Sequence, residues 1–152
     1  MKFYYYYLII LATVACSEAP PNKTGFEFNP NHIAIMVNDL KESGAFYTDI
    51  LLLEEIKITD SKVANRWFKL NNDLEIHLVE SKDELPKRTR NNHIALEVNS
   101  INILVEYLTE KNIPFYNWFG VINEIQKRFD GVLQVYIKDP EENWIEINQK
   151  AK

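Results

Sequence analysis

The sequence predicts an α+β fold in which two βαβββ modules pair with each other. Three observations support this prediction. The segment NHIAIMVN at 31–38 recurs as NHIALEVN at 92–99, with six of eight residues identical, and a repeat of this kind indicates a duplicated unit. Apolar residues with helical spacing follow each copy. Short segments typical of strands then fill the remainder of each half.

The first fifteen residues precede the repeated unit and have the layout of a secretory signal, with one early lysine and an uncharged apolar run over 3–15. Cys16, the only cysteine, follows directly. This arrangement resembles a bacterial lipoprotein signal, although Thr13 stands where leucine is usual. The resemblance implies cleavage before Cys16, lipidation of that residue, and a membrane-anchored protein of the cell envelope that faces the periplasm or the surface. A plain secretory signal or a buried segment is the alternative.

Residues 16–30 are polar, contain three prolines, and are predicted to be a tether. The folded domain then spans 31–150, with modules at 31–81 and 91–149. A hydrophobic content of 46% suits one domain with an ordinary core. The formal net charge is -5, with both signs interspersed, so the sequence has no basic stripe of the kind that nucleic-acid binders carry.

The first module begins with a strand over the NHIAIMV segment. Asp39 is a good N-cap because its side-chain oxygen can accept a bond from an unpaired backbone amide. Apolar residues at three- and four-residue intervals after Asp39 predict a helix that gives way to extended sequence after Glu55. Three strands should follow, the last two joined as a hairpin by the turn residues 71–73. Their predicted ranges are 54–59, 65–70 and 74–80.

The second module repeats this order. Its strand over 92–98 leads to Ser100, a second N-cap, and to a helix that Pro114 stops. Strands are predicted around 114–118, over 132–138 and over 143–149, with DPEEN as the turn between the last two.

Alternation along the strands separates an aliphatic face, suited to pack against the helices, from a mixed face. The mixed face carries all three histidines and one glutamate of the closing strand: His32, His77, His93 and Glu146. A lone histidine that opens a strand is more often a surface residue, and a glutamate between isoleucines usually faces solvent. Independent surface residues have no reason to follow the repeat, however. Because imidazole and carboxylate are the usual ligands of transition metals, the pattern indicates a site where the modules meet.

These residues resemble the vicinal oxygen chelate superfamily, which includes glyoxalase I, methylmalonyl-CoA epimerase, extradiol dioxygenases, and fosfomycin and bleomycin resistance proteins. The likeness covers 31–149 and rests on HIAIMVNDLKESGAFYTDIL, HLVE, HIALEV and YIKDPEENWIEI. It implies a glyoxalase-like fold, a curved mixed sheet around a central cavity, and a divalent ion (Zn, Ni, Co, Mn or Fe) held by His32, His77, His93 and Glu146. The family commonly has Glu or Gln where His77 stands, and Glu75 on the same face is a rival ligand. Glu142 replaces the usual glycine of the final turn.

The resemblance further implies a metal-dependent enzyme that acts on a small oxygen-chelating substrate. Family members often pair modules between chains as homodimers, and a chain with both modules can also close its own site. Three imidazoles and one carboxylate leave the ion a net charge of about +1, so it remains a Lewis acid. A fourth protein ligand favours lyase or isomerase chemistry over oxygen activation. Glu146 and Glu75 are the candidate catalytic residues, with Glu75 or a displaced ligand accepting the proton. The alternatives are a small-molecule binding or resistance protein and an idle scaffold. Export disfavours glyoxalase I itself, whose thiol cofactor is cytoplasmic.

Four further side chains are candidate substrate contacts: Arg66, Phe68, Tyr136 and Trp118. For each, an ordinary exposed or packed residue is an equally good interpretation. Trp118 and Arg128 flank a glycine-containing loop that could cover the pocket.

Overall fold

The computed structural model describes residues 25–58, 62–71 and 74–151. The predicted signal, Cys16 and most of the predicted tether lie outside these residues. Within the described part of the chain, no helix is both long and apolar enough to cross a membrane.

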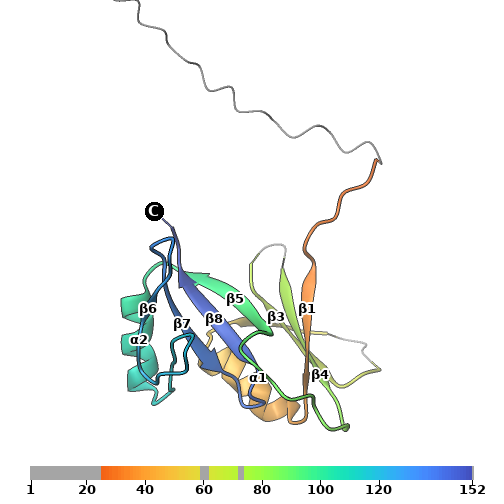
Figure 1. Cartoon of the computed structure of the whole chain (residues 1–152). Coiled ribbons are helices and arrows are strands. Elements are labelled where there is room, and N and C mark those ends of the chain that lie inside the picture. Colours follow the sequence, from red (N-terminus) through yellow and green to blue (C-terminus); the bar gives the residue numbers. More distant parts are fainter. Residues whose placement is uncertain (1–24, 59–61, 72–73, 152) are drawn as a thin grey trace, which may run out of the picture.

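The first module contains one helix and a four-stranded sheet (Figure 1). The strand order is β1-β4-β3-β2, with β1 and β4 parallel and the other neighbours antiparallel. The Asp39 side chain accepts a 2.8 Å hydrogen bond from the Glu42 amide, as the N-cap prediction requires. The elements are β1 (His32–Val37), α1 (Leu40–Asp49), β2 (Glu54–Ile56), β3 (Asn65–Lys69) and β4 (Glu75–Glu80).

The second module has the same element order and the same sheet order, β5-β8-β7-β6, again with its first and last strands parallel. Ser100 caps α2 by accepting from the Ile103 amide at 3.4 Å. The predicted α+β class and the duplicated βαβββ unit are therefore confirmed. The elements are β5 (His93–Val98), α2 (Ile101–Glu110), β6 (Gln126–Lys127), β7 (Leu133–Lys138) and β8 (Trp144–Gln149).

One strand of the second module lies elsewhere than predicted. The segment around 114–118 is not a strand of the sheet, and the two-residue β6 pairs with β7 instead. Tyr116 makes isolated bridges with Tyr136 and Ile122. Proline at 114 supplies no amide donor, and the chain turns back directly after Tyr116, so the ladder cannot extend along this segment.

The aliphatic faces of both sheets form the core, as the alternation predicted. α1 packs on β3 and β4, and α2 packs on β7 and β8. Burial of these side chains supplies the main favourable term in folding. The strand residues that are fully buried are Val37, Phe68, Ile76, Leu78, Val135, Ile137 and Ile145.

Arg66 and Phe68 belong to this core side of the sheet, which corrects the prediction that they line a substrate cavity. The Phe68 ring is 0% exposed and lies 5.6 Å from the Tyr47 ring of α1. The Arg66 guanidinium binds the Glu55 carboxylate at 2.7 and 2.6 Å. It lies against Gly44 of α1, where a side chain would collide with it. Both residues therefore pack toward the helix, and the intervening Trp67 faces the other way.

The turn between β7 and β8 joins the two modules. Its Glu141 Oε1 accepts hydrogen bonds from the backbone amides of Asn38 and Asp39, at 2.7 and 2.8 Å. These amides precede α1, where the first backbone donors of a helix have no partner within it. A carboxylate at this end is also favoured by the helix dipole. The turn of one module thus acts as a cap for the helix of the other.

The buried carboxylate of Asp139 stabilises the same turn by accepting hydrogen bonds. Its carboxylate accepts from the amides of Glu141 and Asn143 at 3.0 and 2.8 Å, from the Asn143 side chain at 2.8 Å, and from the Tyr47 hydroxyl of α1 at 3.3 Å. Asp139 is 3% exposed, and burial raises the pKa of its carboxyl group above the ordinary value. Burial likewise raises the pKa of Tyr47. The inner part of the junction, Asp139 and Tyr47, is therefore buried, and its carboxylate is hydrogen-bonded.

Replacing Phe68 by Ala should lower the free energy of unfolding by about 3–5 kcal/mol, because it leaves a cavity in the core. Phe129, which is 101% exposed, is the matched control, and Phe129→Ala should change stability by less than about 0.5 kcal/mol. Urea unfolding followed by circular dichroism measures both. A Phe68→Ala variant as stable as the wild type would contradict the core assignment.

The Asp139 junction should make stability depend on pH. Because the folded-state pKa of Asp139 is raised, its contribution is fully present below the ordinary pKa of 3.8 and is lost as the pH rises through the folded-state value. The free energy of unfolding of the wild type, relative to that of Asp139→Asn, should therefore fall as the pH rises above the ordinary pKa of 3.8. Urea titrations at a series of pH values measure the difference. The exposed Glu142, as Glu142→Gln, is the control, and a difference independent of pH would contradict the assignment.

Candidate functional site

His93 and Glu146 lie side by side on the mixed face of the second sheet. The parallel register of β5 and β8 pairs Ala95 with Glu146. His93 lies two residues before Ala95 on the same face of β5, so the His93 and Glu146 side chains share one face of the sheet. The His93 Nε2 atom lies 3.0 Å from Glu146 Oε2. Two of the four predicted metal ligands are thus brought into contact.

The Glu146 carboxylate is held by three further side chains. The Tyr136 hydroxyl donates to Oε2, Asn148 Nδ2 donates to Oε1 at 2.7 Å, and Arg128 Nη1 lies 3.7 Å from Oε1. Glu146 is only 7% exposed. A buried carboxylate is costly unless it is paired and hydrogen-bonded, and these partners also fix its orientation. Asn148 lies on the predicted mixed face, but nothing in its spacing singles it out as a site residue.

The hydrogen bond made by His93 Nδ1 determines whether its Nε2 atom, which faces Glu146, carries a hydrogen or a lone pair. The Nδ1 atom is bonded to the backbone carbonyl of Arg90. A carbonyl only accepts, so Nδ1 carries the hydrogen, and the neutral ring presents a lone pair on Nε2. That lone pair faces a carboxylate oxygen at 3.0 Å. Two acceptors in this position repel unless a proton or a metal cation lies between them, and histidines that bind metals are commonly oriented in this way.

Tyr136 and Trp118 lie next to this pair. The Tyr136 ring meets His93 edge to face at 5.7 Å, and the Trp118 ring lies 5.9 Å from Tyr136. Burial, and secondly the hydrogen bond to Glu146, raises the pKa of the Tyr136 hydroxyl, so Tyr136 remains a donor at neutral pH. Trp118 is 38% exposed and can contact a ligand that approaches the pair.

The ligand candidates of the first module form a stack of rings. His77 lies between Trp67 and His32, with ring centroids 3.9 and 4.2 Å away and planes within 7° and 10° of parallel. Its Nε2 atom lies 2.7 Å from Glu75 Oε2, which confirms that Glu75 and His77 share a face. Trp67 was missed because the sequence does not say which side of β3 faces the helix.

The structure therefore brings the predicted ligands together as two pairs, one in each module. Within the described residues, no group of three or more His, Cys, Asp or Glu side chains is placed to hold a metal ion. His93 and Glu146 fit a divalent ion as two of its ligands, and a single chain as described supplies no third. The first strand of each module, β1 or β5, lies at the edge of its sheet.

Comparison with known proteins identifies the family. The model of the Glyoxalase/Bleomycin resistance protein/Dioxygenase superfamily matches residues 29–147. The chain belongs to this superfamily. The match spans both modules and all four candidate ligands, and it confirms the resemblance found in the sequence.

Solved structures with the same fold include proteins of different activities. A glyoxalase family protein from Bacillus anthracis matches with a TM-score of 0.68 and 22% identity, over 83% of this chain and 98% of that one. A fosfomycin resistance protein from Listeria monocytogenes matches with a TM-score of 0.65 and 25% identity, over 83% and 96%. A lactoylglutathione lyase from Agrobacterium tumefaciens matches with a TM-score of 0.59 and 18% identity, over 80% and 92%. No curated protein matches the chain. The superfamily and the fold are thus known, and the reaction is not.

Proposed function

We propose that this superfamily member is a metal-dependent enzyme that acts on a small oxygen-chelating substrate by lyase or isomerase chemistry. The observation that carries the proposal is the opposition of His93 Nε2 and Glu146 Oε2 at 3.0 Å, which a cation between them would relieve. A bound divalent ion, whether Zn, Ni, Co, Mn or Fe, would supply a Lewis acid that polarises the substrate's oxygens. The remaining roles fall to side chains of the protein.

His32 and His77 are the proposed third and fourth ligands, and a second copy of the chain would bring them to His93 and Glu146. In the described residues, neither β1 nor β5 has a strand partner on its outer edge, and unpaired edges of this length invite pairing with another chain. Met36 on the mixed face of β1 is 47% exposed. Contact of β1 in one chain with β5 in another would cover this surface and join the two half-sites.

Besides holding the metal, side chains of the protein must transfer a proton. The Glu75 side chain is 37% exposed and hydrogen-bonded to His77, so it can reach a substrate and accept a proton. Glu146 is less suited to leave its position, because four partners hold it. We therefore assign Glu75 to proton transfer and Glu146 to ligation, with Tyr136 and Trp118 in contact with the substrate.

The choice of lyase or isomerase chemistry rests on the number of protein ligands. Three imidazoles and a carboxylate leave fewer open positions than the two-histidine, one-carboxylate set of oxygen-activating iron enzymes. Export, if it occurs, would separate the protein from the cytoplasmic thiol that glyoxalase I requires. Binding of a small molecule without turnover, as in a resistance protein of the sequestering type, is the alternative, and it predicts ligand affinity without turnover.

Elemental analysis of the protein, purified without added metal, should find close to one equivalent of a divalent metal per chain, and His93→Ala should lose most of it. Removal of one of four ligands should weaken metal binding by at least about tenfold. Asn92→Ala, at the neighbouring exposed position, is the control and should retain the metal. Less than about half an equivalent in the wild type, or no loss in His93→Ala, would overturn the site.

Mixing two inactive variants tests the shared site. His32→Ala and His93→Ala should each bind little metal alone. After unfolding and refolding together, about one quarter of the sites should be intact, because half of the dimers are mixed and each has one wild-type site. No recovery of metal binding in the mixture would contradict a site shared between chains while leaving open one formed within a chain.

We also propose that the protein is exported and anchored to the cell envelope through a lipid on Cys16. Growth of the expressing bacterium with an alkyne-tagged fatty acid should label the wild type and not Cys16→Ser, and the variant should leave the membrane fraction. The layout of the first sixteen residues supports this expectation. Equal labelling of both proteins, or an uncleaved wild type, would contradict it.

A further inference from the structure

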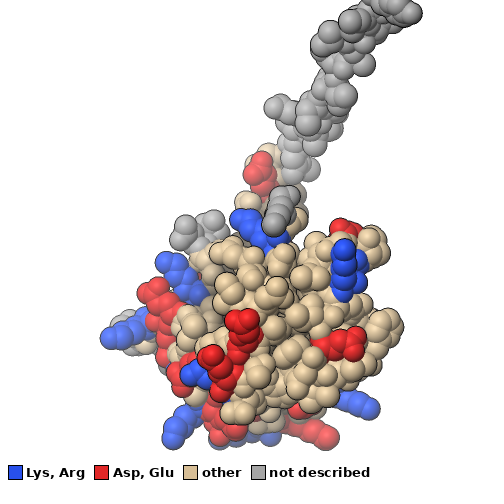
Figure 2. Space-filling model, turned by 90° about the vertical axis from the view of Figure 1, so that its left-hand side faces the viewer, with Lys and Arg blue, Asp and Glu red and all other residues tan. Residues whose placement is uncertain are grey.

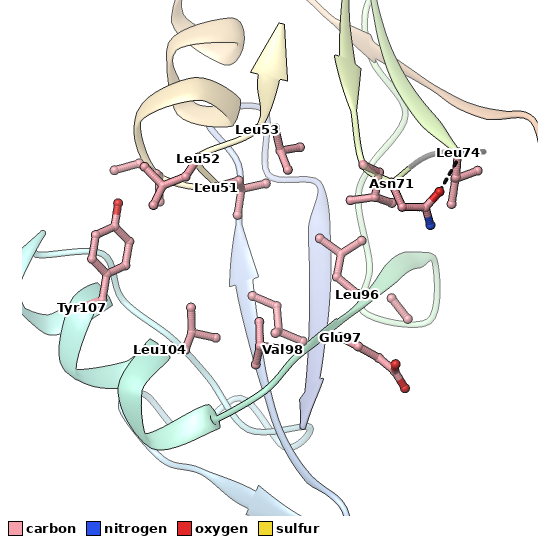
Figure 3. A pocket seen from close by; sticks show the side chains of 14 residues that line it. Leu51, Leu52, Leu53, Asn71, Leu74, Leu96, Glu97, Val98, Leu104 and Tyr107 are labelled. Carbon is pink, nitrogen blue, oxygen red and sulfur yellow. Dashed lines mark hydrogen bonds between the residues drawn. The ribbon is translucent and has the colours of Figure 1, made fainter. Parts of the chain in front are cut away.

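A cavity lies at the junction of the two modules, and it is lined mainly by side chains of the aliphatic face, with Ala95 and Glu97 at the edge of β5. Neither His93 nor Glu146 is among its lining residues. Its volume is about 610 Å³, within the range of about 300–1,000 Å³ typical of small-molecule sites. Figure 3 shows its walls: the leucines at 51–53 that follow α1, Leu96 and Val98 of β5, and Leu104 and Tyr107 of α2. Both modules thus contribute to one concave surface.

The lining is almost wholly aliphatic. None of the described residues that line the cavity is Lys or Arg, and the one charged residue is Glu97. The alternation of β5 places the Glu97 side chain on the mixed face, away from Leu96 and Val98, and its carboxylate points away from the cavity in Figure 3. A charged ligand would lose its hydration here without gaining a partner. The cavity therefore selects against ions.

Two polar groups mark the wall of the cavity. The Tyr107 hydroxyl donates to the Asp49 carbonyl at 2.9 Å, which ties α2 of one module to the end of α1 in the other. Its oxygen keeps lone pairs that can accept a bond from a ligand. Asn71 accepts from the Leu74 amide through Oδ1 at 2.8 Å. These groups suit a ligand with few polar atoms, all of them neutral.

The cavity continues outward along α2. A neighbouring hollow shares Leu52, Val98 and Leu104 with it and extends to Ser100 and Ile103. Leu52 and Ile103 are 70% and 69% exposed, and both lie at the rim of this hollow, so they extend its apolar lining to the surface. Because the two hollows share part of their lining, a molecule longer than either one can lie across both.

We propose that this junction cavity binds an uncharged, elongated and mainly hydrocarbon small molecule. The concave shape, the volume of about 610 Å³ and the walls from both modules favour a small molecule as the occupant. Water is a poor occupant because an aliphatic cavity offers it few hydrogen bonds. The site is separate from the candidate metal site, and its occupation does not depend on metal.

A pair of fluorescent probes with the same ring system tests the proposal on the full chain in the presence of EDTA. N-phenyl-1-naphthylamine is uncharged, and 1-anilinonaphthalene-8-sulfonate carries one negative charge. The uncharged probe should bind with one probe per chain and at least about tenfold more tightly than the sulfonate, because the cavity gives the charge no partner. Equal affinity for both probes would overturn the proposal.

Two variants test whether the uncharged probe binds in this cavity. Val98→Trp fills the cavity and should weaken binding of the uncharged probe by at least about tenfold. Leu52→Trp, at the exposed mouth where folding tolerates the change, should weaken it several-fold. Val63→Trp, at a position that is 57% exposed and does not line the cavity, is the control and should bind as the wild type does. The apolar run at 3–15 is common to all variants, so a difference reports the cavity.

Titration with the uncharged probe at several protein concentrations tests whether a second copy of the chain covers the cavity. Affinity for the uncharged probe should not change with protein concentration. A fall in affinity that follows dimer formation in analytical ultracentrifugation would show that a second copy covers the cavity and would overturn the proposal. Unchanged binding to both Val98→Trp and Leu52→Trp would do the same. Neither result bears on the metal content of His93→Ala, so the two sites stand or fall separately.

Discussion

The interaction on which the rest of the structure depends is the contact between the β7–β8 turn and the start of α1. Glu141 satisfies two backbone amides that α1 itself cannot satisfy, and Asp139 receives the Tyr47 hydroxyl from the same helix. Because both carboxylates belong to one hydrogen-bonded turn of the second module, that turn ties the second module to the start of α1 in the first. Two units that are each too small to bury a large core thereby become one domain.

This junction determines which surfaces face inward. The aliphatic faces and the helices meet around it, whereas the mixed faces of β1 and β5 remain open, with Met36 and Glu97 exposed. The structure therefore has two distinct regions, one apolar and one lined by polar side chains. The cavity between the modules is aliphatic, and the donors that could hold a metal lie on the other side of the strands as two half-sites. On the face seen in Figure 2, acidic and basic side chains are interspersed without a continuous basic stripe, in keeping with the composition.

Much of this arrangement was predictable from the sequence, and the parts that were not share one cause. The repeat located both modules, and alternation placed His93 with Glu146 and Glu75 with His77, because a strand that carries a clear aliphatic row has only one way to face a helix. In β3 the four positions 66–69 are all large or charged, so alternation did not reveal that Phe68 is buried and that Trp67 stacks on His77. Likewise, a two-residue strand such as β6 is too short for periodicity to show. The sequence also cannot say whether partner modules come from one chain or two, since identical edge patterns serve both.

The state of His93 shows how a backbone contact can set the chemistry of a site. The Arg90 carbonyl requires the hydrogen on Nδ1, so Nε2 has one lone pair and a carboxylate oxygen in front of it. A proton can occupy that position and form an ion pair, or a divalent cation can occupy it and bind both atoms. The Tyr136 and Asn148 donors leave Glu146 oriented in either case, because they bond to the carboxylate and not to the imidazole. If a divalent metal binds here as proposed, it would compete with the proton for this lone pair while Tyr136 and Asn148 keep the carboxylate in place, as a preorganised metal ligand requires.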